Sequence, residues 1–391
     1  MQFAKRLQAL SQNVFADMDR AKTSARNSGQ EIIDLSLGSS DLPVAESTIE
    51  AIKTALYDPT THGYLLHAGT KDFRVAAANW YSAKFNIPVD PETEVLPLIG
   101  SQEGTAHLPL AVLNAGDIAL LLDPGYPSHA GGVYLAGGDI YPMPLLAENN
   151  FLPVLENISA NVLAKAKMMV LSYPHNPTSA IAPLAFFQQA VEFCRQHDLV
   201  LVHDFPYVDL VFDEKNLAPS IIQADPNKEL SIEFFTLSKS YNMGGFRIGY
   251  AIGNQQLITA LRQIKAVVDF NQYRGILNGA IAALSGSQTS VTQTVATFKQ
   301  RRDVFVRALN DIGWQVSSPQ ATMYIWAKLP EPWQNNSVDF CTKLVAHTGV
   351  AASPGAGFGQ SGEGYVRFAL VRDPDTLRQA AAKIRQFINQ R

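Results

Sequence analysis

The sequence predicts an α/β fold in which a parallel or mixed sheet is covered by helices on both faces. Between residues 94 and 253, short apolar runs end at turn residues and alternate with helical patterns such as residues 183–198. Near-continuous apolar strands of this kind are typical of sheets buried on both faces. The seven runs are EVLPLIG (94–100), DIALLLD (117–123), DIYPMPL (139–145), MMVLSYP (168–174), LVLVHDFP (199–206), FFTLS (234–238) and IGYAIG (248–253).

Polar and glycine-containing segments follow these apolar runs. Open α/β sheets bind their ligands at the carboxyl ends of the strands, so the segments after the runs form the candidate site. These segments are 101–104, 124–127, 175–178, 204–207 and 238–240.

The chain after about residue 285 predicts a second, smaller α+β domain. It contains a helix with a basic face (297–313), a strand pair at WQVSS (314–318) and TMYIWAKL (322–329), another helix, and the strand YVRFALV (365–371). The chain before residue 41 is assigned to an N-terminal arm and to part of this smaller domain. The predicted division is therefore 1–40, 41–284 for the large cofactor-binding domain, and 285–391 for the small domain.

The N-terminal residues 1–20 carry charges throughout and lack the unbroken apolar run of a signal peptide. Their apolar positions lie on one stripe of a helix, which we expect to pack on its own domain; the alternative is a neighbouring subunit. These positions are Phe3, Leu7, Leu10, Val14, Phe15 and Met18. The longest apolar stretch, 107–123, is too short and too interrupted to span a membrane.

The composition argues against several classes of protein. The 391 residues are 17% charged and 47% hydrophobic, and a chain of this length can bury a core without metals or disulfides. A net charge of −4 argues against a nucleic-acid partner. The two cysteines, Cys194 and Cys341, cannot form a disulfide framework, so a reducing cytoplasm is the expected location.

Lys239 is the most informative residue in the chain. It directly follows an apolar strand pattern, and an amine in that position can form an imine with a carbonyl compound. A lysine after a strand is more often a surface residue, but Arg247 follows in the glycine-flanked turn 244–249. A guanidinium there suits a phosphate group because it donates two parallel hydrogen bonds.

Asp204 ends another strand pattern, where an unpaired carboxylate is costly. Considered alone, it is best interpreted as a helix cap or a salt-bridge partner. Together with Tyr207 and Lys239 it fits pyridoxal phosphate. The carboxylate can hold the pyridine nitrogen protonated, the phenol can bond the ring oxygen and the lysine can hold the aldehyde.

Other positions suit the anionic groups of such a cofactor and its substrate. The turn 100–104 links a strand to a helix, and free backbone N–H groups at a helix N-terminus bind anions. Tyr126 can stack on a flat ring. Arg367 lies inside an apolar strand and needs an anionic partner, either a core carboxylate or a substrate carboxylate. Asn176 supplies a neutral donor.

Templates for other chemistries do not fit the sequence. The glycine-rich segment 355–364 is followed by a strand pattern, where a dinucleotide fingerprint requires a helix. There is no GxxxxGK[ST] and no GxSxG, and the histidines lack the spacing of a zinc site. The sequence therefore predicts no metal.

These residues resemble the class I and II pyridoxal-phosphate aminotransferases of fold type I. The segment TLSKSYNMGGFRIG (236–249) is similar to the lysine motif of that family, and ordered matches run over nearly the whole chain. The others are LSLGSSDLP (35–43), GYLLHAGTKDFR (63–74), IGSQEG (99–104), DPGYP (123–127), NPTSA (176–180), HDFPY (203–207) and PGAGFGQSGEGYVRFAL (354–370). The segments LGSSDLP, GSQEGTAHLPLA and GFGQSGEGYVRFAL look most like the LL-diaminopimelate and aspartate-type branch.

The resemblance implies a cytoplasmic homodimer that exchanges an amino group between an L-amino acid and a 2-oxo acid in amino-acid biosynthesis. Lys239 would carry the internal aldimine and move the proton, and Asp204 would pair with the pyridinium nitrogen. The resemblance assigns the ring oxygen to Tyr207 and Asn176, the ring face to Tyr126, and the phosphate to Ser101, Gln102, Thr236, Ser238, Arg247 and the other subunit's Tyr64. It assigns the substrate carboxylate to Arg367, Asn176 and the backbone of Gly38.

Three departures from the family pattern leave the substrate branch open. His175 stands where the family often has Asn, Ser179 where Gly is commoner, and Phe205-Pro206 where a small or polar pair is more usual. Two alternatives remain at this point. One is a β-eliminating C–S lyase of the same fold, and the other is a non-catalytic aminotransferase-like regulator.

Overall fold

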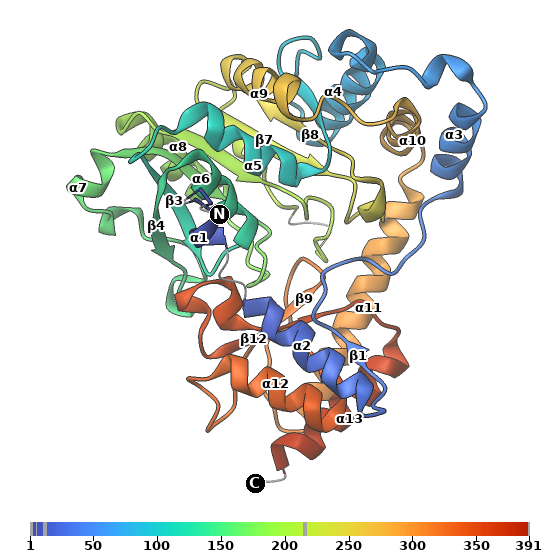
Figure 1. Cartoon of the computed structure of the whole chain (residues 1–391), viewed down its shortest axis with the longest axis vertical. Helices are drawn as coiled ribbons and strands as arrows, with labels where there is room; N and C mark the ends of the chain where they lie inside the picture. The colour runs from blue at the N-terminus through green and yellow to red at the C-terminus, as the bar shows by residue number, and fades with distance from the viewer. Residues whose placement is uncertain (1–2, 5, 11–13, 214–216, 390–391) are drawn as a thin grey trace.

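A seven-stranded sheet forms the centre of the larger part of the molecule (Figure 1). The computed structural model describes residues 3–4, 6–10, 14–213 and 217–389. The strands are β2 (Val95–Leu98), β3 (Ile118–Asp123), β4 (Asp139–Pro144), β5 (Ala166–Leu171), β6 (Val200–Asp204), β7 (Ser231–Thr236) and β8 (Gly249–Gly253), in the order β2-β8-β7-β6-β5-β3-β4. Within this sheet β8 runs in the opposite direction to the other six strands. The predicted mostly parallel sheet is confirmed.

Alternate residues of the central strands face two separate cores. Leu120 and Leu122 of β3 belong to the core on one face, whereas Ala119 and Leu121 belong to the core on the other. This is the period of two that a strand imposes, and helices must cover both faces because both are apolar. The helices of this part are α3 (Glu46–Leu56), α4 (Lys71–Phe85), α5 (Ser101–Val112), α6 (Pro127–Ala136), α7 (Ala160–Leu163), α8 (Leu184–Gln196), α9 (Gln255–Val268) and α10 (Arg274–Ser285).

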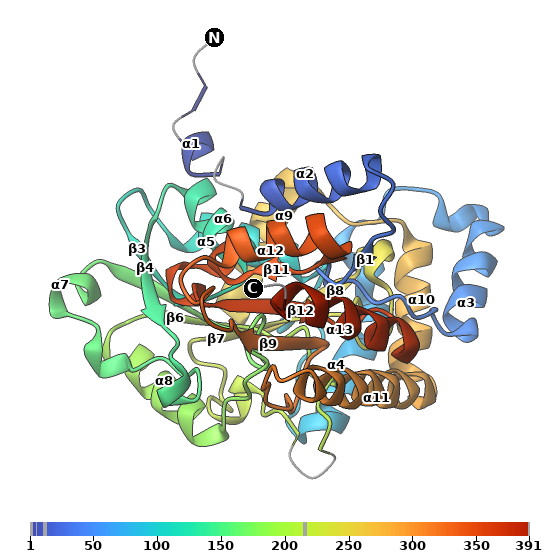
Figure 2. The ribbon, with the colours of Figure 1, turned by 90° about the horizontal axis from the view of Figure 1, so that it is seen from below.

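The smaller part of the molecule is built from both ends of the chain (Figure 2). Its antiparallel sheet has the order β11-β12-β9, and β1 from the N-terminal segment pairs parallel with β10. The strands are β1 (Ile33–Asp34), β9 (Tyr324–Lys328), β10 (Val350–Ala351), β11 (Ser353–Pro354) and β12 (Tyr365–Ala369). The helices are α2 (Val14–Asn27), α11 (Thr289–Asp311), α12 (Ser337–Thr348) and α13 (Pro374–Asn389). The exact domain boundaries, placed at residues 41 and 285 from the sequence, stay a prediction.

One local expectation differs from the structure, and another is tested only in part. The segment 314–318 forms no strand, because the buried Trp314 indole donates to the Lys328 carbonyl at 2.7 Å and β9 pairs with β12 instead. The N-terminal helix is described as two pieces, α1 (Arg6–Leu10), which lies against α6, and α2, which packs on α12. Residues 11–13 of the predicted single helix lie outside the described residues. No helix among the described residues is long and apolar enough to cross a membrane.

Candidate active site

Several of the predicted site residues lie in segments at one edge of the seven-stranded sheet. Parallel strands end at a common edge, and the antiparallel β8 begins at that edge. Asp204 ends β6, Lys239 comes shortly after β7, and Arg247 lies just before β8. The chain brings further predicted residues to this edge by the same rule: Ser101 and Gln102 after β2, Tyr126 after β3 and Asn176 after β5.

Lys239 is half-buried in the turn that follows β7. Its Nζ donates to the carbonyl oxygen of Gly38 at 2.6 Å and lies 5.7 Å from the centroid of the Tyr207 ring. Gly38 belongs to the segment between β1 and α3. The hydrogen bond of Lys239 therefore links the edge of the sheet to the N-terminal segment.

Asp204 is 4% exposed, and its two oxygens have different surroundings. Oδ2 lies 3.0 Å from Nε2 of His129, whereas buried Oδ1 has no hydrogen-bond partner among the described residues. His129 lies in the first turn of α6, and its ring is 5.6 Å from the Tyr126 ring at an interplanar angle of 84°. The sequence analysis missed His129. Its position three residues after Tyr126, at the start of a helix, was the signal that could have found it.

Arg247 lies against the start of α5. Gly100 has a positive φ of 76°, and a Cβ added there would lie 2.5 Å from a terminal nitrogen of Arg247. Arg247 Nη1 also donates to the carbonyl of Gly244 at 2.9 Å. The helix N-terminus and the guanidinium thus form one positively polarised corner. Nearby, Thr236 Oγ1 lies 2.8 Å from Ser238 Oγ and 3.2 Å from the carbonyl of Ile248.

Arg367 is 6% exposed on β12, yet no carboxylate among the described residues pairs with it. Its Nη1 donates to Oδ1 of Asn176 at 2.8 Å and its Nη2 to the carbonyl of Ser36 at 2.7 Å. Nε is buried without a hydrogen-bond partner among the described residues. Of the two partners considered for this arginine, the core carboxylate is therefore not found. Asn176 is held beside it.

Tyr324 is a second residue that the sequence analysis missed. Its hydroxyl oxygen lies 2.8 Å from that of Tyr207, and its ring lies under the Arg367 guanidinium, 4.3 Å from centroid to Cζ. Burial raises the pKa of Tyr207 well above its ordinary value. For Tyr324 burial acts in the same direction, but the positive charges of Lys239 and Arg367 together with the hydrogen bond to Tyr207 outweigh it, and the pKa of Tyr324 is lowered.

Tyr64 is not brought to the other predicted residues within this chain. It is 96% exposed, in the segment between the short 3₁₀ helices Pro59–Thr61 and His67–Thr70. Other large apolar side chains near it in the sequence are also exposed, namely Leu56, Tyr57 and Leu66. The predicted role of Tyr64 needs a second subunit, so it stays a prediction.

Two of the residues that depart from the family pattern, His175 and Ser179, lie in the loop that contains Asn176. Burial, together with His129, lowers the pKa of His175 to about 3, so its ring is neutral. His175 Nδ1 lies 2.8 Å from Oγ1 of Thr178, and Ser179 Oγ lies 2.7 Å from Oγ1 of Thr322. Phe205 is fully buried in the core beneath the sheet. None of these side chains adds a charge near Asn176.

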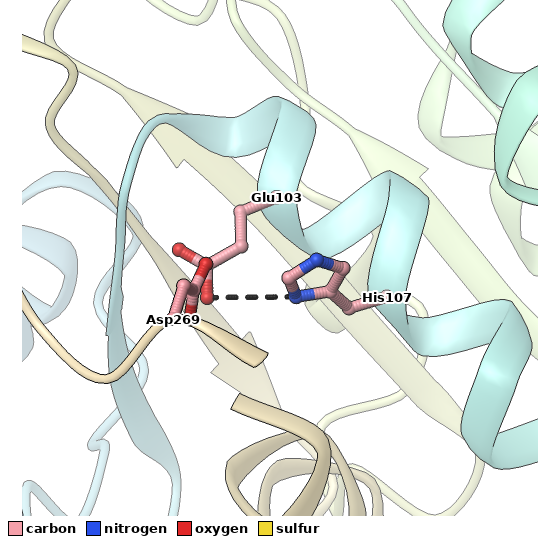
Figure 3. Close-up of side chains that lie close together, drawn as sticks. All are labelled: Glu103, His107 and Asp269. Atoms are coloured by element: carbon pink, nitrogen blue, oxygen red, sulfur yellow. Dashed lines mark ion pairs between the residues drawn. The ribbon is translucent and has the colours of Figure 1, made fainter. Parts of the chain in front are cut away.

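One group of side chains among the described residues has the composition of a metal site. Figure 3 shows Glu103 and His107 on α5 and Asp269 at the end of α9. The ammonium of Lys265 lies 2.8 Å from Glu103 and 3.4 Å from Asp269. A lysine therefore already balances both carboxylates, which is the part that a metal ion would otherwise play.

A family model described as aminotransferase class I and II matches residues 30–384. The chain belongs to this family. An LL-diaminopimelate aminotransferase of Dehalococcoides mccartyi is 43% identical over 390 residues, which cover 100% of both chains. A solved structure of a probable N-succinyldiaminopimelate aminotransferase from Thermus thermophilus is 41% identical, with a TM-score of 0.90, over 95% of this chain and 99% of that one. Substrate-bound BacF from Bacillus subtilis is 33% identical, with a TM-score of 0.94, over 99% and 98%.

The protein is accordingly a pyridoxal-phosphate-dependent aminotransferase of fold type I. The predictions of the family, the fold class, the enzyme class and the cofactor are confirmed. The alternatives of a C–S lyase and of a non-catalytic regulator receive no support from the Dehalococcoides mccartyi and Thermus thermophilus relatives, both of which are named as aminotransferases.

Proposed function

We propose that the residues gathered at the sheet edge bind pyridoxal phosphate and exchange an amino group between an L-amino acid and a 2-oxo acid. The observation that carries this proposal is the carboxylate of Asp204. It is buried, one oxygen is held by His129, and the other has no partner among the described residues. A buried carboxylate oxygen is costly without a donor, and the protonated nitrogen of a pyridine ring is a donor of the right kind.

Pyridoxal phosphate, when bound, withdraws electrons from the α-carbon of the amino acid. The negative charge of Asp204 keeps the ring nitrogen protonated, and a protonated ring withdraws electrons more strongly. His129 keeps the carboxylate of Asp204 in one orientation. Tyr207 and Asn176 are the proposed partners of the ring oxygen, and Tyr126 is the proposed cover of the ring face.

The corner formed by α5 and Arg247 is the proposed phosphate site. The first N–H groups of an α-helix have no partner within the helix, so they attract an anion, and Arg247 adds a full positive charge beside them. Thr236, the last residue of β7, and Ser238, which follows that strand, supply further hydroxyl donors. Ser101 and Gln102 complete the proposed set from the first turn of α5.

Arg367 is the proposed receptor of the substrate's α-carboxylate. Its guanidinium is buried without a carboxylate partner among the described residues, and such a charge is stabilised when a ligand supplies one. Asn176 fixes the guanidinium from one side and Ser36 from the other, so its orientation is set before substrate arrives. The backbone of Gly38 is the proposed third contact of the carboxylate.

Lys239 is the proposed catalytic base and acid. Its amine lies at the same sheet edge as Asp204, and its present bond to Gly38 connects it with the segment that flanks Arg367. In this role it removes the proton from the α-carbon of the amino acid and returns a proton to the α-carbon of the incoming 2-oxo acid.

A homodimer is the proposed functional unit, located in the cytoplasm. Tyr64 supports the dimer because its side chain is 96% exposed and its hydroxyl makes no hydrogen bond to the described residues. The exposed apolar residues Leu56, Tyr57 and Leu66 occupy the same stretch of chain, and exposed apolar clusters mark protein interfaces. The neighbour's phosphate corner is the proposed destination of the Tyr64 hydroxyl.

The proposed amino donor is LL-diaminopimelate or a related dicarboxylic amino acid, and the proposed role is therefore biosynthetic. The support comes from a relative that is 43% identical to this chain over its full length and is named LL-diaminopimelate aminotransferase. A panel of amino donors, each supplied with 2-oxoglutarate, tests this. Diaminopimelate should give the highest kcat/KM. A kcat/KM about tenfold higher for an aromatic or methionine-like donor would contradict the proposed donor.

Replacement of Lys239 by alanine tests the proposed site as a whole. We expect Lys239→Ala to lose transamination and the near-visible absorption that borohydride abolishes in the wild type. Lys167→Ala, an exposed lysine on β5, is the control and should keep both. Wild-type turnover in Lys239→Ala would contradict the assignment of Lys239.

A further inference from the structure

The crossing segment, residues 36–41 between β1 and α3, contacts two of the proposed functional side chains through backbone carbonyls. The carbonyl of Ser36 accepts from Arg367 Nη2 at 2.7 Å, and that of Gly38 accepts from Lys239 Nζ at 2.6 Å. The geometry of such contacts depends on where the backbone runs and not on which side chains it carries. The residues that anchor the crossing segment therefore affect the site.

The two ends of the crossing segment are held in different ways. On the N-terminal side Leu35 extends the pairing of β1 with β10, because its N–H donates to the carbonyl of Ala351 at 2.9 Å. On the C-terminal side Asp41 forms an ion pair with Arg301 of α11, with an Nη1–Oδ1 distance of 2.6 Å and an Nη2–Oδ2 distance of 2.9 Å. Two parallel bonds between a guanidinium and a carboxylate fix direction as well as distance.

Arg301 lies on the helix that connects the two parts of the molecule. Val291, near the start of α11, belongs to the core of the larger part, whereas Phe298 belongs to the core of the smaller part. Arg301 is 5% exposed, and its Nη1 also donates to the carbonyl of Leu370 at 3.1 Å. The guanidinium is therefore held in place from the smaller part, and it presents both terminal nitrogens to the crossing segment.

A second pair of contacts ties the crossing segment to the turn that carries Lys239. Ser40 Oγ donates to Oδ1 of Asn242 at 2.7 Å, and Asn242 lies in the turn after Lys239. Asn242 Nδ2 donates in turn to Oγ1 of Thr294 at 3.0 Å. Thr294 lies about two turns before Arg301 on α11, so the two side chains share one face of the helix. This face holds the crossing segment and the lysine turn in a fixed relation to each other.

We propose that Arg301 is a positioning residue for the substrate: its ion pair with Asp41 holds the crossing segment in place. The Ser36 carbonyl of that segment then fixes the guanidinium of Arg367. The inference rests on the proposed function, because it takes Arg367 as the receptor of the substrate carboxylate. Lys239 takes no part in these contacts, so they remain when its amine holds the cofactor. The contribution of Arg301 to the loaded enzyme therefore falls on substrate binding.

Steady-state kinetics of the cofactor-loaded enzyme test these contacts. We expect Arg301→Met to raise KM for both the amino acid and the 2-oxo acid about tenfold, while kcat changes less than about twofold. Asp41→Asn should raise both KM values as much. Arg301→Met combined with Asp41→Asn should raise them no further, because both substitutions remove one ion pair. Unchanged KM values in Arg301→Met, or effects of the two substitutions that add, overturn the proposal.

Two further variants separate positioning from a general loss of stability. Arg301→Lys keeps the charge but cannot make two parallel bonds, so its KM values should lie between those of the wild type and of Arg301→Met. If Arg301→Met does not fold, wild-type KM values in Arg301→Lys overturn the proposal.

Arg302→Met is the matched control for the loss of a buried arginine. Arg302 is the next residue of α11, is 8% exposed, and pairs with Asp303 at 2.6 Å. Its Nη1 donates to a backbone carbonyl, that of Pro319, at 2.9 Å. We expect the KM values of this variant to equal those of the wild type. A rise as large as that of Arg301→Met would show that the loss of any buried arginine from α11 has this effect, and would overturn the proposal.

Hydrogen–deuterium exchange of the cofactor-free protein distinguishes this inference from the proposed function. The backbone N–H groups of Ser36 and Leu42 each donate to a side-chain oxygen, so a peptide that covers 35–43 reports on the order of the crossing segment. Its exchange should be faster in Arg301→Met than in the wild type, and unchanged in Arg302→Met. Equal exchange in Arg301→Met and the wild type overturns the inference, and so does faster exchange with unchanged KM values. If exchange behaves as expected but the wild type transfers no amino group, the proposed function alone is wrong.

Discussion

His129 holds one oxygen of Asp204, with 3.0 Å between Nε2 and Oδ2, and both side chains are almost fully buried. The two residues come from α6 and β6 and lie 75 positions apart in the sequence. The contact leaves Oδ1 as the oxygen that can accept a bond from a ligand. In the proposed cofactor site, the carboxylate that accepts the ligand's hydrogen bond is therefore held in one orientation by a second residue, His129.

Replacement of Asp204 by asparagine should keep the shape of this contact and remove its charge. We expect kcat to fall by about 100- to 1000-fold, the scale at which a single preorganised electrostatic group contributes to catalysis. His129→Asn leaves the charge of Asp204 in place but holds its carboxylate less firmly, so kcat should fall only about tenfold. Steady-state kinetics at saturating cofactor measure both, with Asp139→Asn on the exposed edge strand β4 as the control. Asp204→Asn with wild-type kcat would contradict the role of Asp204.

Replacement of Arg367 by methionine should weaken the binding of both substrates. The amino acid and the 2-oxo acid share a carboxylate, and the lost charge pair is worth about 2–5 kcal/mol, or roughly 30- to 5000-fold in kcat/KM. We expect the change to appear in KM for both substrates, while the affinity for the cofactor is kept. Arg385→Met, on the exposed side of α13, is the control. A Tm that falls while both KM values stay unchanged would indicate a structural role only.

Replacement of Gly100 by alanine should weaken cofactor binding. The added Cβ would lie 2.5 Å from the Arg247 guanidinium, and the positive φ of 76° strains any residue with a side chain. Gly313→Ala is a matched control, because its φ is 88° and nothing lies within 4 Å of the added Cβ. Both variants should lose about 1–2 kcal/mol of stability from backbone strain. Only Gly100→Ala should also raise the Kd for pyridoxal phosphate, measured by absorbance titration, and equal Kd values in both variants would exclude the effect.

The sequence was sufficient for the groups that end or follow strands, and insufficient for groups that reach the site from elsewhere. Asp204 and Lys239 could be predicted because their neighbours in the chain define the strand ends. The contacts of His129 with Asp204 and of Tyr324 with Tyr207 span 75 and 117 positions, and only the place of His129 in the helix turn after Tyr126 gave a local signal. The segment 314–318 has an apolar pattern similar to that of a strand, but a side-chain bond of Trp314 to β9 replaces the expected pairing. Local patterns do not encode such distant contacts.

Replacement of Lys265 by methionine should destabilise the fold in a pH-dependent way. Burial raises the pKa of Glu103 above its ordinary 4.5, although the ammonium of Lys265 lies 2.8 Å away and acts to lower it. A carboxyl group with a raised pKa contributes stability below the unfolded value and loses it as pH rises through the folded value. Without Lys265 the folded pKa rises further, so the loss at about pH 8 should reach roughly 3–5 kcal/mol and be smaller at about pH 5.

Urea denaturation at the two pH values measures this effect. Lys265→Met combined with Glu103→Gln should recover most of the stability, because no unpaired charge is then buried. Equal losses at both pH values, in the single variant, would mean that lost packing and not the charge of Glu103 is responsible.

Subunit mixing tests whether Tyr64 serves the neighbouring site. If each site takes Lys239 from one chain and Tyr64 from the other, a mixed dimer of Lys239→Ala and Tyr64→Ala chains contains one site with both residues intact. The Lys239→Ala homodimer should be inactive and the Tyr64→Ala homodimer should bind cofactor weakly. After the two proteins are unfolded together and refolded, about half of the dimers should be mixed, which restores about a quarter of the wild-type sites.

Activity at low cofactor concentration distinguishes the two arrangements. Under that condition Tyr64→Ala alone contributes little, so a gain above the sum of the two homodimers requires an intact site formed from both chains. If Tyr64 served its own chain, the mixed dimer would hold one site without Lys239 and one without Tyr64, and mixing would bring no gain. Exposure of Tyr64 to 96% in the single chain is compatible with the hydroxyl reaching a neighbour, and the gain on mixing is the measurement that decides it.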